Sequence, residues 1–335
     1  MRVLHVTNAY PSDKAPVKGI FVKEQIDSLA AQGVRAEAWP ISKERDGLLA
    51  YFKAWWYMLR YARHYDIVHC HHVLVGLLGM FAVPRRKLMV SFMNDGRHNL
   101  KGKLSPLGGP VFWLLTRYVK WKVYKSRLPE RWAGDGAVLL PNGVNMQHFT
   151  LQPRREAKAV LGLDVNKRYV LFVSANTVRP EKRHDLFMRA VAEAQQHDPR
   201  IEPLVMYQAS RAEVPLYFNA ASAHLLASDF EGSPNSVREA LACGTPVVAR
   251  DVGGVAQILD GLACCRMVTG ADGALLGKAL AEVLEAVADD DETLRASLRK
   301  HLEVQGFTLE QVAASLKALY QQILNSGHLV DGRKR

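Results

Sequence analysis

The fold of this chain is decided by one stretch, Leu225-Leu-Ala-Ser-Asp-Phe-Glu-Gly-Ser-Pro-Asn-Ser-Val-Arg-Glu-Ala-Leu-Ala-Cys-Gly-Thr-Pro-Val-Val-Ala249. Its two apolar ends predict buried strands, and the polar centre followed by an apolar repeat predicts a loop and then a helix. Ser233 is a favoured N-cap residue, and Pro234 suits the first helical position. The order strand, loop, helix, strand is the βαβ unit of a parallel sheet.

The start of the predicted helix offers a site for an anion. The first-turn backbone N–H groups, those of Asn235 and Ser236 included, point out of the helix N-terminus toward the end of the preceding strand. Glu231 stands in the loop, and Glu239 lies a turn and a half inside the helix, so both carboxylates can border one crevice. They can accept hydrogen bonds from sugar or ribose hydroxyls while the helix end receives phosphate. The alternative is an ordinary capped helix with a solvated Arg238–Glu239 face.

The same alternation of apolar runs and helical patterns continues along all 335 residues, of which 48% are apolar and 23% charged. This length and composition suffice for two α/β domains, each with its own core. The predicted strands are Val3–Thr7, Val34–Trp39, Ile67–Cys70, Leu88–Phe92 and Ala137–Leu140 in the first half, and Tyr169–Val173, Pro203–Tyr207, Ala223–Ala227 and Pro246–Ala249 in the second.

Helices are predicted over Phe21–Ala31, Gly273–Val287 and Leu309–Leu324, with a linker at Phe149–Arg154. We therefore expect a first domain over residues 1–150 and a second over 151–310. Residues 311–335 would form a C-terminal helix and tail that can pack back on the first domain.

Targeting signals and cysteine usage bear on where the protein works. The N-terminus begins with a strand pattern instead of a secretory signal, and the apolar run Val73–Val83 is shorter than the ~20 residues that span a bilayer. The four cysteines lack the spacing of a disulfide framework. We expect a cytoplasmic protein, with a peripheral position on the inner face of the membrane as a second location.

The net charge of +11 is unevenly distributed. Residues 1–150 hold 22 Lys and Arg against 10 Asp and Glu, a balance of +12, which leaves −1 for the remainder. All six tryptophans lie in this basic half, and the segments Tyr51–Arg63 and Val111–Arg127 mix aromatic and basic residues at helical spacing. Such helices settle on anionic membranes, with Trp55, Trp56, Trp113 and Trp121 as contact candidates. The alternative is core helices with snorkelling Lys and Arg stems. No nucleic-acid motif accompanies the charge.

The Glu231–Glu239 segment resembles the E-x7-E signature of retaining glycosyltransferases of family 4. Further stretches resemble that family in the same order: Gly19-Ile-Phe-Val-Lys-Glu-Gln25, Asp66-Ile-Val-His-Cys-His71, Leu140-Pro-Asn-Gly-Val-Asn145 and Arg179-Pro-Glu-Lys-Arg-His-Asp185. The resemblance implies the GT-B fold, in which two Rossmann-like domains face each other and the active site lies in the interdomain cleft. It also implies transfer of a sugar from a nucleotide-diphosphate sugar with retention of configuration, to a saccharide or lipid-linked acceptor in cell-surface glycan or polysaccharide synthesis.

The resemblance assigns roles to side chains of the second domain. Glu239 matches the glutamate that holds the nucleotide ribose, Glu231 the one near hydroxyls of the transferred sugar, and Lys182 the lysine that meets the donor diphosphate. Ala175-Asn176 replaces the Gly-Arg pair usual before this lysine, and whether Arg179 supplies the absent cation stays open. The predicted donor-binding set also includes Gly232, Asn235 and Ser236.

Two positions of the first domain belong to the same prediction. His71 matches the histidine that reaches the transferred sugar, and it forms the predicted catalytic set together with Lys182 and Glu231. Gly19 matches a glycine of the donor-binding loop before the first helix. The segment Tyr207–Val214 is too short for the strand and helix common there in the family, so the base contacts of that region do not transfer.

The predicted chemistry needs no cofactor and no metal, because Lys182 and helix amides stand where a cation would neutralise the diphosphate. The family's retention is ascribed to attack on the same face, with the departing phosphate taking the acceptor proton. Two other sequence patterns are typical of metal sites, but each has a simpler explanation. On a strand only His69 and His71 of the His69-Cys70-His71-His72 run share a face, and Asp289-Asp-Asp291 falls where acidic residues favour the next helix N-terminus.

Other enzyme and binding classes remain as alternatives. A dinucleotide oxidoreductase would need a glycine-rich turn after the first strand, and Asn8-Ala-Tyr-Pro-Ser-Asp13 lacks one. A sugar-nucleotide epimerase of the same architecture is the closest enzymatic alternative. A catalytically silent protein that binds a membrane surface is the other. Donor sugar, base, acceptor and linkage are not specified by the sequence.

Overall fold

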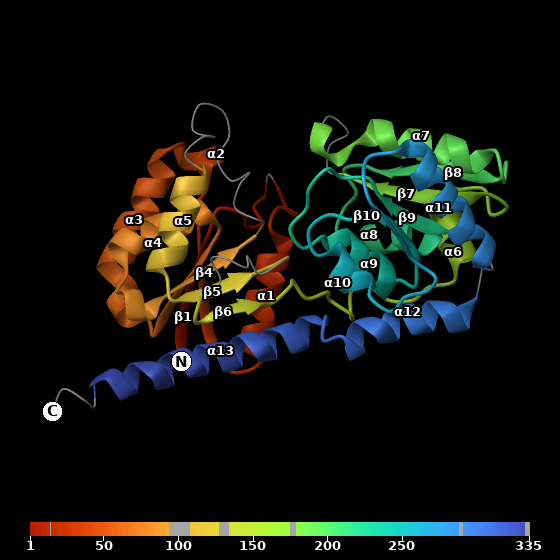
Figure 1. Ribbon diagram of the computed structural model, residues 1–335. Helices are drawn as coiled ribbons and strands as arrows, with labels where there is room; N and C mark the ends of the chain where they lie inside the picture. Colours follow the sequence, from red (N-terminus) through yellow and green to blue (C-terminus); the bar gives the residue numbers. More distant parts are fainter. Residues whose placement is uncertain (14, 94–107, 127–133, 175–178, 288–290, 332–335) are drawn as a thin grey trace. The chain divides into compact units, whose positions relative to one another are not determined.

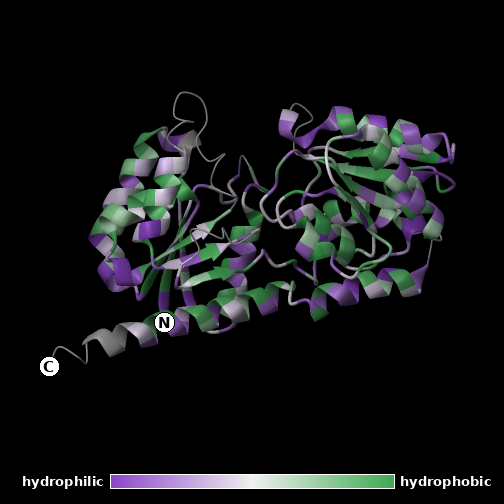
Figure 2. Ribbon diagram, in the orientation of Figure 1, coloured by the Kyte–Doolittle hydropathy of each residue, from purple (hydrophilic) through white to green (hydrophobic). Residues whose placement is uncertain are grey.

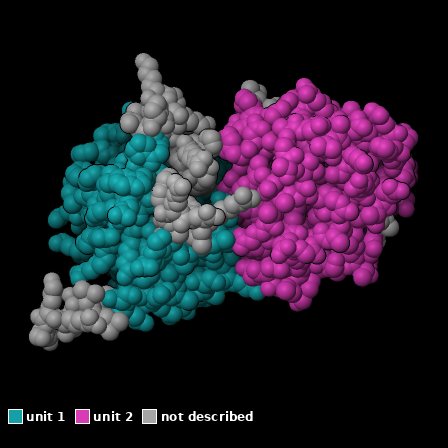
Figure 3. All heavy atoms as spheres, viewed as in Figure 1, with its two compact units in different colours: residues 1–143, 309–335 teal, residues 144–308 magenta. Residues whose placement is uncertain are grey.

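The structure is a computed structural model that describes residues 1–13, 15–93, 108–126, 134–174, 179–287 and 291–331. The chain forms two compact units, Met1–Gly143 with Leu309–Arg335 (unit 1) and Val144–Thr308 (unit 2) (Figure 3). Each unit is an α/β body around one parallel sheet, and each is described by itself.

Unit 1 is built on a six-stranded sheet in the order β2-β1-β3-β4-β5-β6, and every pair of neighbours is parallel (Figure 1). The strands are β1 (Arg2–Thr7), β2 (Arg35–Pro40), β3 (Ile67–His71), β4 (Leu88–Phe92), β5 (Trp121–Tyr124) and β6 (Ala137–Leu139). The helices are α1 (Ile20–Ala31), α2 (Lys43–Asp46), α3 (Leu49–Tyr61), α4 (Val73–Ala82), α5 (Gly108–Tyr118) and α13 (Leu309–Asp331), with short 3-10 turns η1 (Ala62–His64) and η2 (Arg85–Lys87).

Helices cover both faces of this sheet. On one face, side chains of α3, α4 and α5 pack with alternate strand residues such as Leu4, Val68 and Val90. On the other, α1 and α13 pack with the residues between them, such as Val3 and Met89. In Figure 2 the helices carry stripes of hydrophobic and hydrophilic residues, as expected where one side of a helix meets a sheet. The C-terminal helix therefore belongs to the body formed by the first residues of the chain.

Unit 2 contains a five-stranded parallel sheet in the order β11-β10-β9-β7-β8. Its strands are β7 (Arg168–Val173), β8 (Ile201–Met206), β9 (Ala223–Leu226), β10 (Val247–Arg250) and β11 (Arg266–Val268). Its helices are α6 (Arg154–Val160), α7 (His184–Gln195), α8 (Val214–Ala220), α9 (Asn235–Ala242), α10 (Val255–Leu259), α11 (Gly273–Ala286) and α12 (Glu292–Val304), with the 3-10 turn η4 (Pro180–Lys182).

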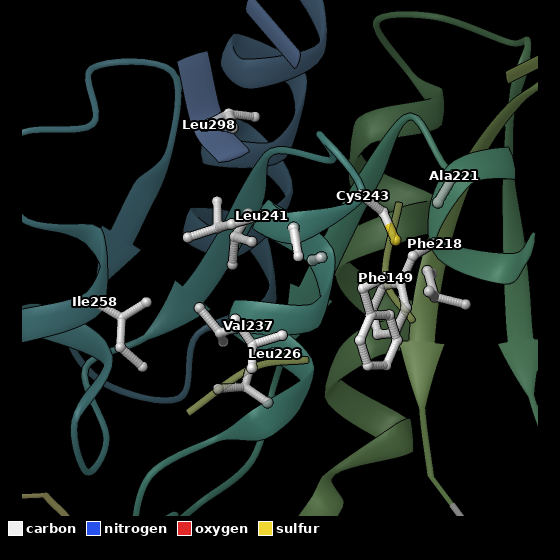
Figure 4. Packing of buried hydrophobic residues seen from close by; sticks show 14 of the residues in the cluster. Phe149, Phe218, Ala221, Leu226, Val237, Leu241, Cys243, Ile258 and Leu298 are labelled. Carbon is white, nitrogen blue, oxygen red and sulfur yellow. The ribbon is translucent and has the colours of Figure 1, made fainter. Parts of the chain in front are cut away.

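The core of unit 2 fixes α9 against the sheet. Figure 4 shows Val237 and Leu241 of α9 among the same buried side chains as Leu226 of β9 and Ile258 of α10. Both α9 residues are fully buried, so full burial of each contributes about 1.5–3 kcal/mol. This packing fixes the helix whose first residues follow the loop that carries Glu231.

The predicted strands are all present, with ends that differ by up to two residues, but one segment was misread. The expected helix over Val111–Arg127 is α5 only as far as Tyr118, and Trp121–Tyr124 form β5. Trp121 is therefore a core residue, 5% exposed, and its assignment as a membrane contact was wrong. Aromatic and branched residues fit a half-buried strand as well as a helix. The run Trp121–Tyr124 is only four residues long, too short to show the change from the helical period to the two-residue period of a strand.

The start of α9 also differs from the prediction. The helix begins at Asn235, its cap position is Pro234, and it has no side-chain cap. Ser233 instead accepts a hydrogen bond of 2.8 Å from Arg238. Arg238 is fully buried, so the alternative of a solvated Arg238–Glu239 face is wrong for Arg238. Asp291 does cap the following helix α12, by accepting from Leu294 N–H at 2.9 Å, whereas Asp289 lies outside the described residues.

The remaining global expectations concern membranes and thiols. Of the helices in the described ranges, none combines the length and apolar character needed to span a bilayer. All four cysteines are free thiols, three of them buried. Residues 207–213 join β8 to α8 without a further strand or helix, as the short Tyr207–Val214 segment predicted.

Candidate functional site

The predicted donor-binding residues of unit 2 follow the carboxyl ends of adjacent strands. Lys182 comes after β7, Glu231 after β9, and the loop after β10 carries Gly253. Since the strands are parallel, these loops meet at one edge of the sheet. β8 and β9 lie on opposite sides of β7, so this edge includes a topological switch point, where open α/β sheets bind their ligands.

Lys182 and Glu231 form an ion pair at this edge. The Lys182 ammonium donates to Glu231 Oε1 at 2.7 Å, and the two side chains are 20% and 17% exposed. The partial burial makes the attraction stronger than at an open surface. The structure thus brings together two of the three predicted catalytic residues.

The loop that carries Glu231 is held from two sides. Arg250 donates to the carbonyls of Ala227 and Ser228 and to the Asp229 carboxylate, the last at 2.6 Å. Arg183 donates to the same carboxylate at 3.1 Å. These contacts fix the loop, and no pattern in the sequence predicted them.

Gly253 is a further residue that sequence reasoning missed. Its φ of +58° is left-handed, and a Cβ there would lie 2.3 Å from Gly232 O and 2.5 Å from Glu231 O. Gly254 N–H donates to Gly232 O at 2.9 Å. The pair Gly253-Gly254 after a strand was the available signal, because only glycine permits so close a backbone approach. Gly232, a predicted donor-binding residue, thus lies in the backbone contact between the Glu231 loop and the Gly253-Gly254 turn.

Glu239 has a partner that the sequence did not suggest. Arg211, in the loop after β8, lies with its Nη1 3.5 Å from Glu239 Oε1, and both side chains are largely buried. The guanidinium also lies 4.8 Å from the centre of the Phe149 ring. Arg211 therefore adds a cation to the carboxyl edge of the sheet.

Arg179 is turned toward a neighbouring carboxylate. Its Nε and Nη2 both donate to Glu181 Oε1, at 2.9 and 2.7 Å, and the side chain is half exposed. Its place beside Lys182 in the chain leaves it able to exchange this partner for a phosphate. The Ala175-Asn176 departure lies outside the described residues.

The first turn of α9 presents backbone groups while its side chains face inward. Asn235 Oδ1 accepts from Arg238 at 2.9 Å. Ser236 Oγ lies 3.0 Å from His224 Nε2, and His224 Nδ1 lies 2.9 Å from Leu171 O. A carbonyl only accepts, so His224 Nδ1 carries the proton and Ser236 donates to Nε2. Burial lowers the pKa of His224 to about 4, which keeps this ring neutral.

In unit 1, His71 ends β3 and is buried. Its Nε2 lies 2.9 Å from His5 Nδ1. Within the described residues, its Nδ1 has no hydrogen-bond partner. Burial lowers the pKa of His71 well below 6.5. The next residue, His72, has φ 92° and ψ 148°, a strained conformation for a residue with a side chain, and such strain clusters at functional sites.

His5 joins the two histidines of β3 that share a face. Nitrogen atoms of His5, His69 and His71 lie within 4.8 Å of one another, a separation that also suits a metal ion. Gly19 lies elsewhere in unit 1, at the N-terminus of α1. Its φ is +66°, and a Cβ there would lie 2.1 Å from Ala9 O, so the loop requires glycine.

A cleft of about 410 Å³ opens at the carboxyl ends of β1 and β2 in unit 1. Its lining combines apolar surface with polar side chains, which are Asn8, Tyr10, Ser12, Asp13, Lys18, Ser42 and Arg45. Hydroxyl, amide, carboxylate and basic groups together suit a ligand with several hydroxyls, and Lys18 and Arg45 can also meet an acidic group.

Comparisons with known proteins find similarity to glycosyltransferases in sequence and in fold. Residues 196–286 match the family model for glycosyl transferases group 1. The chain is 26% identical to a D-inositol 3-phosphate glycosyltransferase of Geodermatophilus obscurus over 307 residues, which cover 77% of this chain and 66% of that protein. It is 27% identical to the protein of the same name from Kineococcus radiotolerans over 249 residues, which cover 59% of this chain and 57% of that protein. The chain thus spans less than two thirds of these relatives' length.

Solved structures extend the similarity to the whole fold. Sucrose-phosphate synthase from Thermosynechococcus elongatus superposes with a TM-score of 0.77 at 18% identity, covering 97% of this chain and 99% of that one. Anabaena HepE in complex with UDP-glucose superposes with a TM-score of 0.67 at 15% identity, covering 97% of this chain and 99% of that one. The fold is that of the GT-B glycosyltransferases. The similarity in sequence is thus to group 1 glycosyltransferases over residues 196–286, and the similarity in fold extends over nearly the whole chain.

Proposed function

We propose that the protein is a retaining glycosyltransferase that moves a sugar from a nucleotide-diphosphate sugar to a saccharide or lipid-linked acceptor. The observation that carries the proposal is the Lys182–Glu231 ion pair at the carboxyl edge of the unit 2 sheet. It lies on the same edge as the N-terminus of α9, which adds aligned backbone N–H groups. A cation, a carboxylate and a helix N-terminus together match the groups of a sugar diphosphate.

In this proposal each donor group has a partner in unit 2. The ribose hydroxyls donate hydrogen bonds to Glu239, and the sugar hydroxyls donate to Glu231. The diphosphate oxygens accept hydrogen bonds from Lys182 and from the first-turn N–H groups of α9. Asn235 and Ser236 contribute through their backbones, because their side chains already bond to Arg238 and His224. Arg179 and Arg211 are the two candidates for the second cation that a diphosphate needs.

In the chemistry we propose, the departing phosphate is both the leaving group and the proton acceptor. A nucleoside diphosphate leaves readily once positive charge meets its developing charge, so the site needs cations more than a general acid. Lys182 supplies that charge without a metal ion. The acceptor hydroxyl attacks on the face from which the diphosphate leaves, and a phosphate oxygen takes its proton, so the configuration is retained.

Nucleotides in neighbouring structures support a nucleotide donor. Similar structures of Anabaena HepE hold UDP or UDP-glucose, and that of the starch synthase IV catalytic domain of Arabidopsis thaliana holds ADP. These nucleotides differ in the base. The proposal therefore extends to the nucleoside diphosphate and leaves the base to measurement.

For the acceptor we propose a polyhydroxylated molecule with an anionic group, bound on the unit 1 side. The unit 1 cleft with Lys18 and Arg45 in its lining supports this, and so does the +12 balance of residues 1–150. Relatives named for D-inositol 3-phosphate point to the same chemistry. A lipid-linked saccharide phosphate would have it as well.

The outer face of α3 supports a position on an anionic membrane, at the inner face in the cytoplasm. Leu49, Phe52, Trp56 and Leu59 are 50–58% exposed, and the exposed Lys53 and Arg60 lie next to them along the helix. Helix α3 contains no acidic residue. Phe52, Trp56 and Lys53 also line a groove of about 420 Å³. An acyl chain can lie on its aromatic rings, and the lipid phosphate would replace Asp46, to which Lys53 donates at 2.5 Å.

Liposome flotation tests the membrane part. We expect the protein to float with phosphatidylglycerol vesicles at low salt, to be released as salt rises, and to ignore neutral vesicles. Phe52→Glu with Trp56→Glu should abolish flotation. Val304→Glu, at a residue of unit 2 that is 71% exposed, should leave flotation unchanged. Equal flotation of both variants would remove α3 as the membrane face.

A sugar-nucleotide epimerase of the same architecture is the alternative enzyme. Transfer and epimerisation differ in what is released. We expect free nucleoside diphosphate to appear from the matching nucleotide sugar in proportion to added acceptor, and EDTA to leave the rate unchanged. Release of an isomerised sugar without acceptor would refute transfer. Loss of activity with EDTA and rescue by Mg²⁺ or Mn²⁺ would refute the metal-independent mechanism.

A further inference from the structure

A buried guanidinium lies beside the first turn of α9. Arg238 is 0% exposed, although arginine is almost never fully buried unless it is paired. Its Nη1 donates to Ser233 Oγ at 2.8 Å, and its Nη2 donates to Ser233 O at 3.1 Å and to Asn235 Oδ1 at 2.9 Å. Helical side chains tilt toward the N-terminus of their helix, and these bonds show that Arg238 does so. The guanidinium therefore lies level with the start of α9.

The charge of Arg238 has no counter-charge in contact with it. All three of its acceptors are neutral oxygens, and its Nε has no hydrogen-bond partner among the described residues. Glu239 favours the charge only through space, and Arg211 lies beside that carboxylate. Burial lowers the pKa of Arg238 to about 10, so the group stays charged at neutral pH. A charge in the interior without a partner is unfavourable, and an anion bound nearby would offset that cost.

The start of α9 is the place where such an anion can bind. The first-turn N–H groups of a helix lack partners within the helix and carry partial positive charge. An anion that accepts from them would lie on the order of one helical turn, about 5 Å, from the Arg238 guanidinium. Because Arg238 is fully buried, solvent screens this attraction less than it would at an open surface. The guanidinium and the helix N–H groups therefore act on the same anion.

We propose that Arg238 is the second cation of the donor diphosphate site and acts from beneath the first turn of α9 without touching the ligand. The inference rests on the proposed function, in which a nucleoside diphosphate binds at this helix N-terminus. Arg179 and Arg211 each face a carboxylate, with which a diphosphate must compete. Arg238 has no such competitor among the described residues, so its charge is available whenever the donor arrives.

The alternative is that Arg238 only holds the turn before α9. Its bonds to Ser233 and Asn235 tie this turn to the helix, and a neutral side chain with N–H groups can form bonds of the same kind. Only a charged side chain attracts an anion from a position that the ligand does not reach. The two roles separate when the charge of residue 238 is changed and its capacity to donate hydrogen bonds is kept.

Two variants of the full chain make this separation. Arg238→Gln keeps N–H donors and removes the charge, whereas Arg238→Lys keeps both. The probes are inorganic pyrophosphate and whichever of UDP, GDP and ADP the wild type binds. Calorimetry at neutral pH should show about a tenfold weaker affinity for both probes in Arg238→Gln, and Arg238→Lys should recover most of it. The uncharged nucleoside, whose weak binding NMR titration measures, should bind all three proteins equally.

Arg295→Gln is the matched control. Arg295 is a second buried arginine of unit 2, and it donates to Cys243 O at the opposite end of α9. Its replacement should leave the affinity for the diphosphate unchanged. A measurement on the wild type keeps the test open if Arg238→Gln does not fold. The ¹⁵N NMR signal of Arg238 Nε–H, assigned by its loss in Arg238→Lys, should shift when pyrophosphate binds.

The outcomes distinguish this inference from the proposed function. Wild-type affinity in Arg238→Gln, equal losses in the Gln and Lys variants, an equal loss for the nucleoside, or an Nε–H signal that bound pyrophosphate does not shift would each overturn the role of Arg238. All of these leave the donor site itself standing. A wild-type protein that binds neither pyrophosphate nor any of the three nucleotides would refute the proposed donor site, and this inference with it.

Discussion

At the scale of single residues, the unit 2 site is nearly charge-neutral before a donor arrives. Lys182 is paired with Glu231, and Arg211 lies beside Glu239. Neither carboxylate is therefore buried without a cation, which would cost several kcal/mol. A diphosphate that approaches Lys182 releases Glu231 from its ion pair, and the freed carboxylate can accept from sugar hydroxyls.

Glu239→Ala should weaken binding of the nucleotide sugar by about 1–3 kcal/mol, as expected for the loss of hydrogen bonds to a charged group. Calorimetry on the folded variant measures this directly. Glu285→Ala removes an exposed glutamate of α11 in the same unit and should leave the affinity unchanged. Equal affinities for Glu239→Ala and the wild type would remove Glu239 from the ribose site.

The partners of these residues mark the limit of what the sequence predicted. Glu231, Glu239 and Lys182 were predicted from spacing and resemblance, because they stand in short local sequence patterns. Arg211 and Gly253 lie 28 residues before and 22 after their contacts at Glu239 and Glu231. Contacts of this kind depend on which loops the sheet order brings together, and a local pattern does not contain that order.

At the scale of elements, the loop between β9 and α9 is fixed by its neighbours. Arg250 and Arg183 hold Asp229, and the Gly253-Gly254 turn packs on the backbone of Glu231 and Gly232. A rigid loop loses little conformational entropy when it binds a ligand, so more of the contact energy appears as affinity.

Gly253→Ala should impair donor binding out of proportion to its backbone strain, because its Cβ would displace the Glu231–Gly232 carbonyls. Gly261→Ala separates the two effects. Gly261 has φ +78° and nothing within 4 Å of a Cβ, so it carries the strain of about 1 kcal/mol without the clash. Thermal unfolding and donor titration of both variants make the comparison. A similar loss of donor binding in both would contradict a positioning role for Gly253.

Elements with a long, clear period were predicted closely, and the error fell where the period changed. The helix Phe21–Ala31 and the nine predicted strands match the structure within two residues at each end. The failure at β5 came from a strand of four residues directly after an amphipathic helix of similar composition. Lys122 of this strand and Lys125 directly after it are buried, although lysine is rarely a buried residue.

At the scale of the whole molecule, the two units differ in their response to acid. Unit 1 buries His5, His69 and His71 as neutral rings, and burial lowers the pKa of each. Unit 2 has His224, with a pKa of about 4. Below the ordinary value of 6.5 the unfolded chain takes up protons that these folded rings refuse, so stability falls as pH falls.

Each such ring should contribute a slope of about 1.4 kcal/mol per pH unit below pH 6.5, which makes unit 1 the more acid-sensitive unit. All six tryptophans lie in residues 1–143, so tryptophan fluorescence reports on unit 1 alone. Urea unfolding followed by this signal should show a midpoint that drops steeply between pH 6.5 and 4.5. A midpoint that stays constant over this range would contradict neutral buried imidazoles.

The most direct test of the central claim is isothermal titration of the wild-type chain with a panel of UDP-, GDP- and ADP-sugars in the presence of EDTA. The proposed donor site predicts that at least one nucleotide sugar binds with one-to-one stoichiometry, and that Lys182→Met and Glu239→Ala both weaken that binding. No binding of any nucleotide sugar at millimolar concentration, or binding that both variants leave unchanged, would contradict the account.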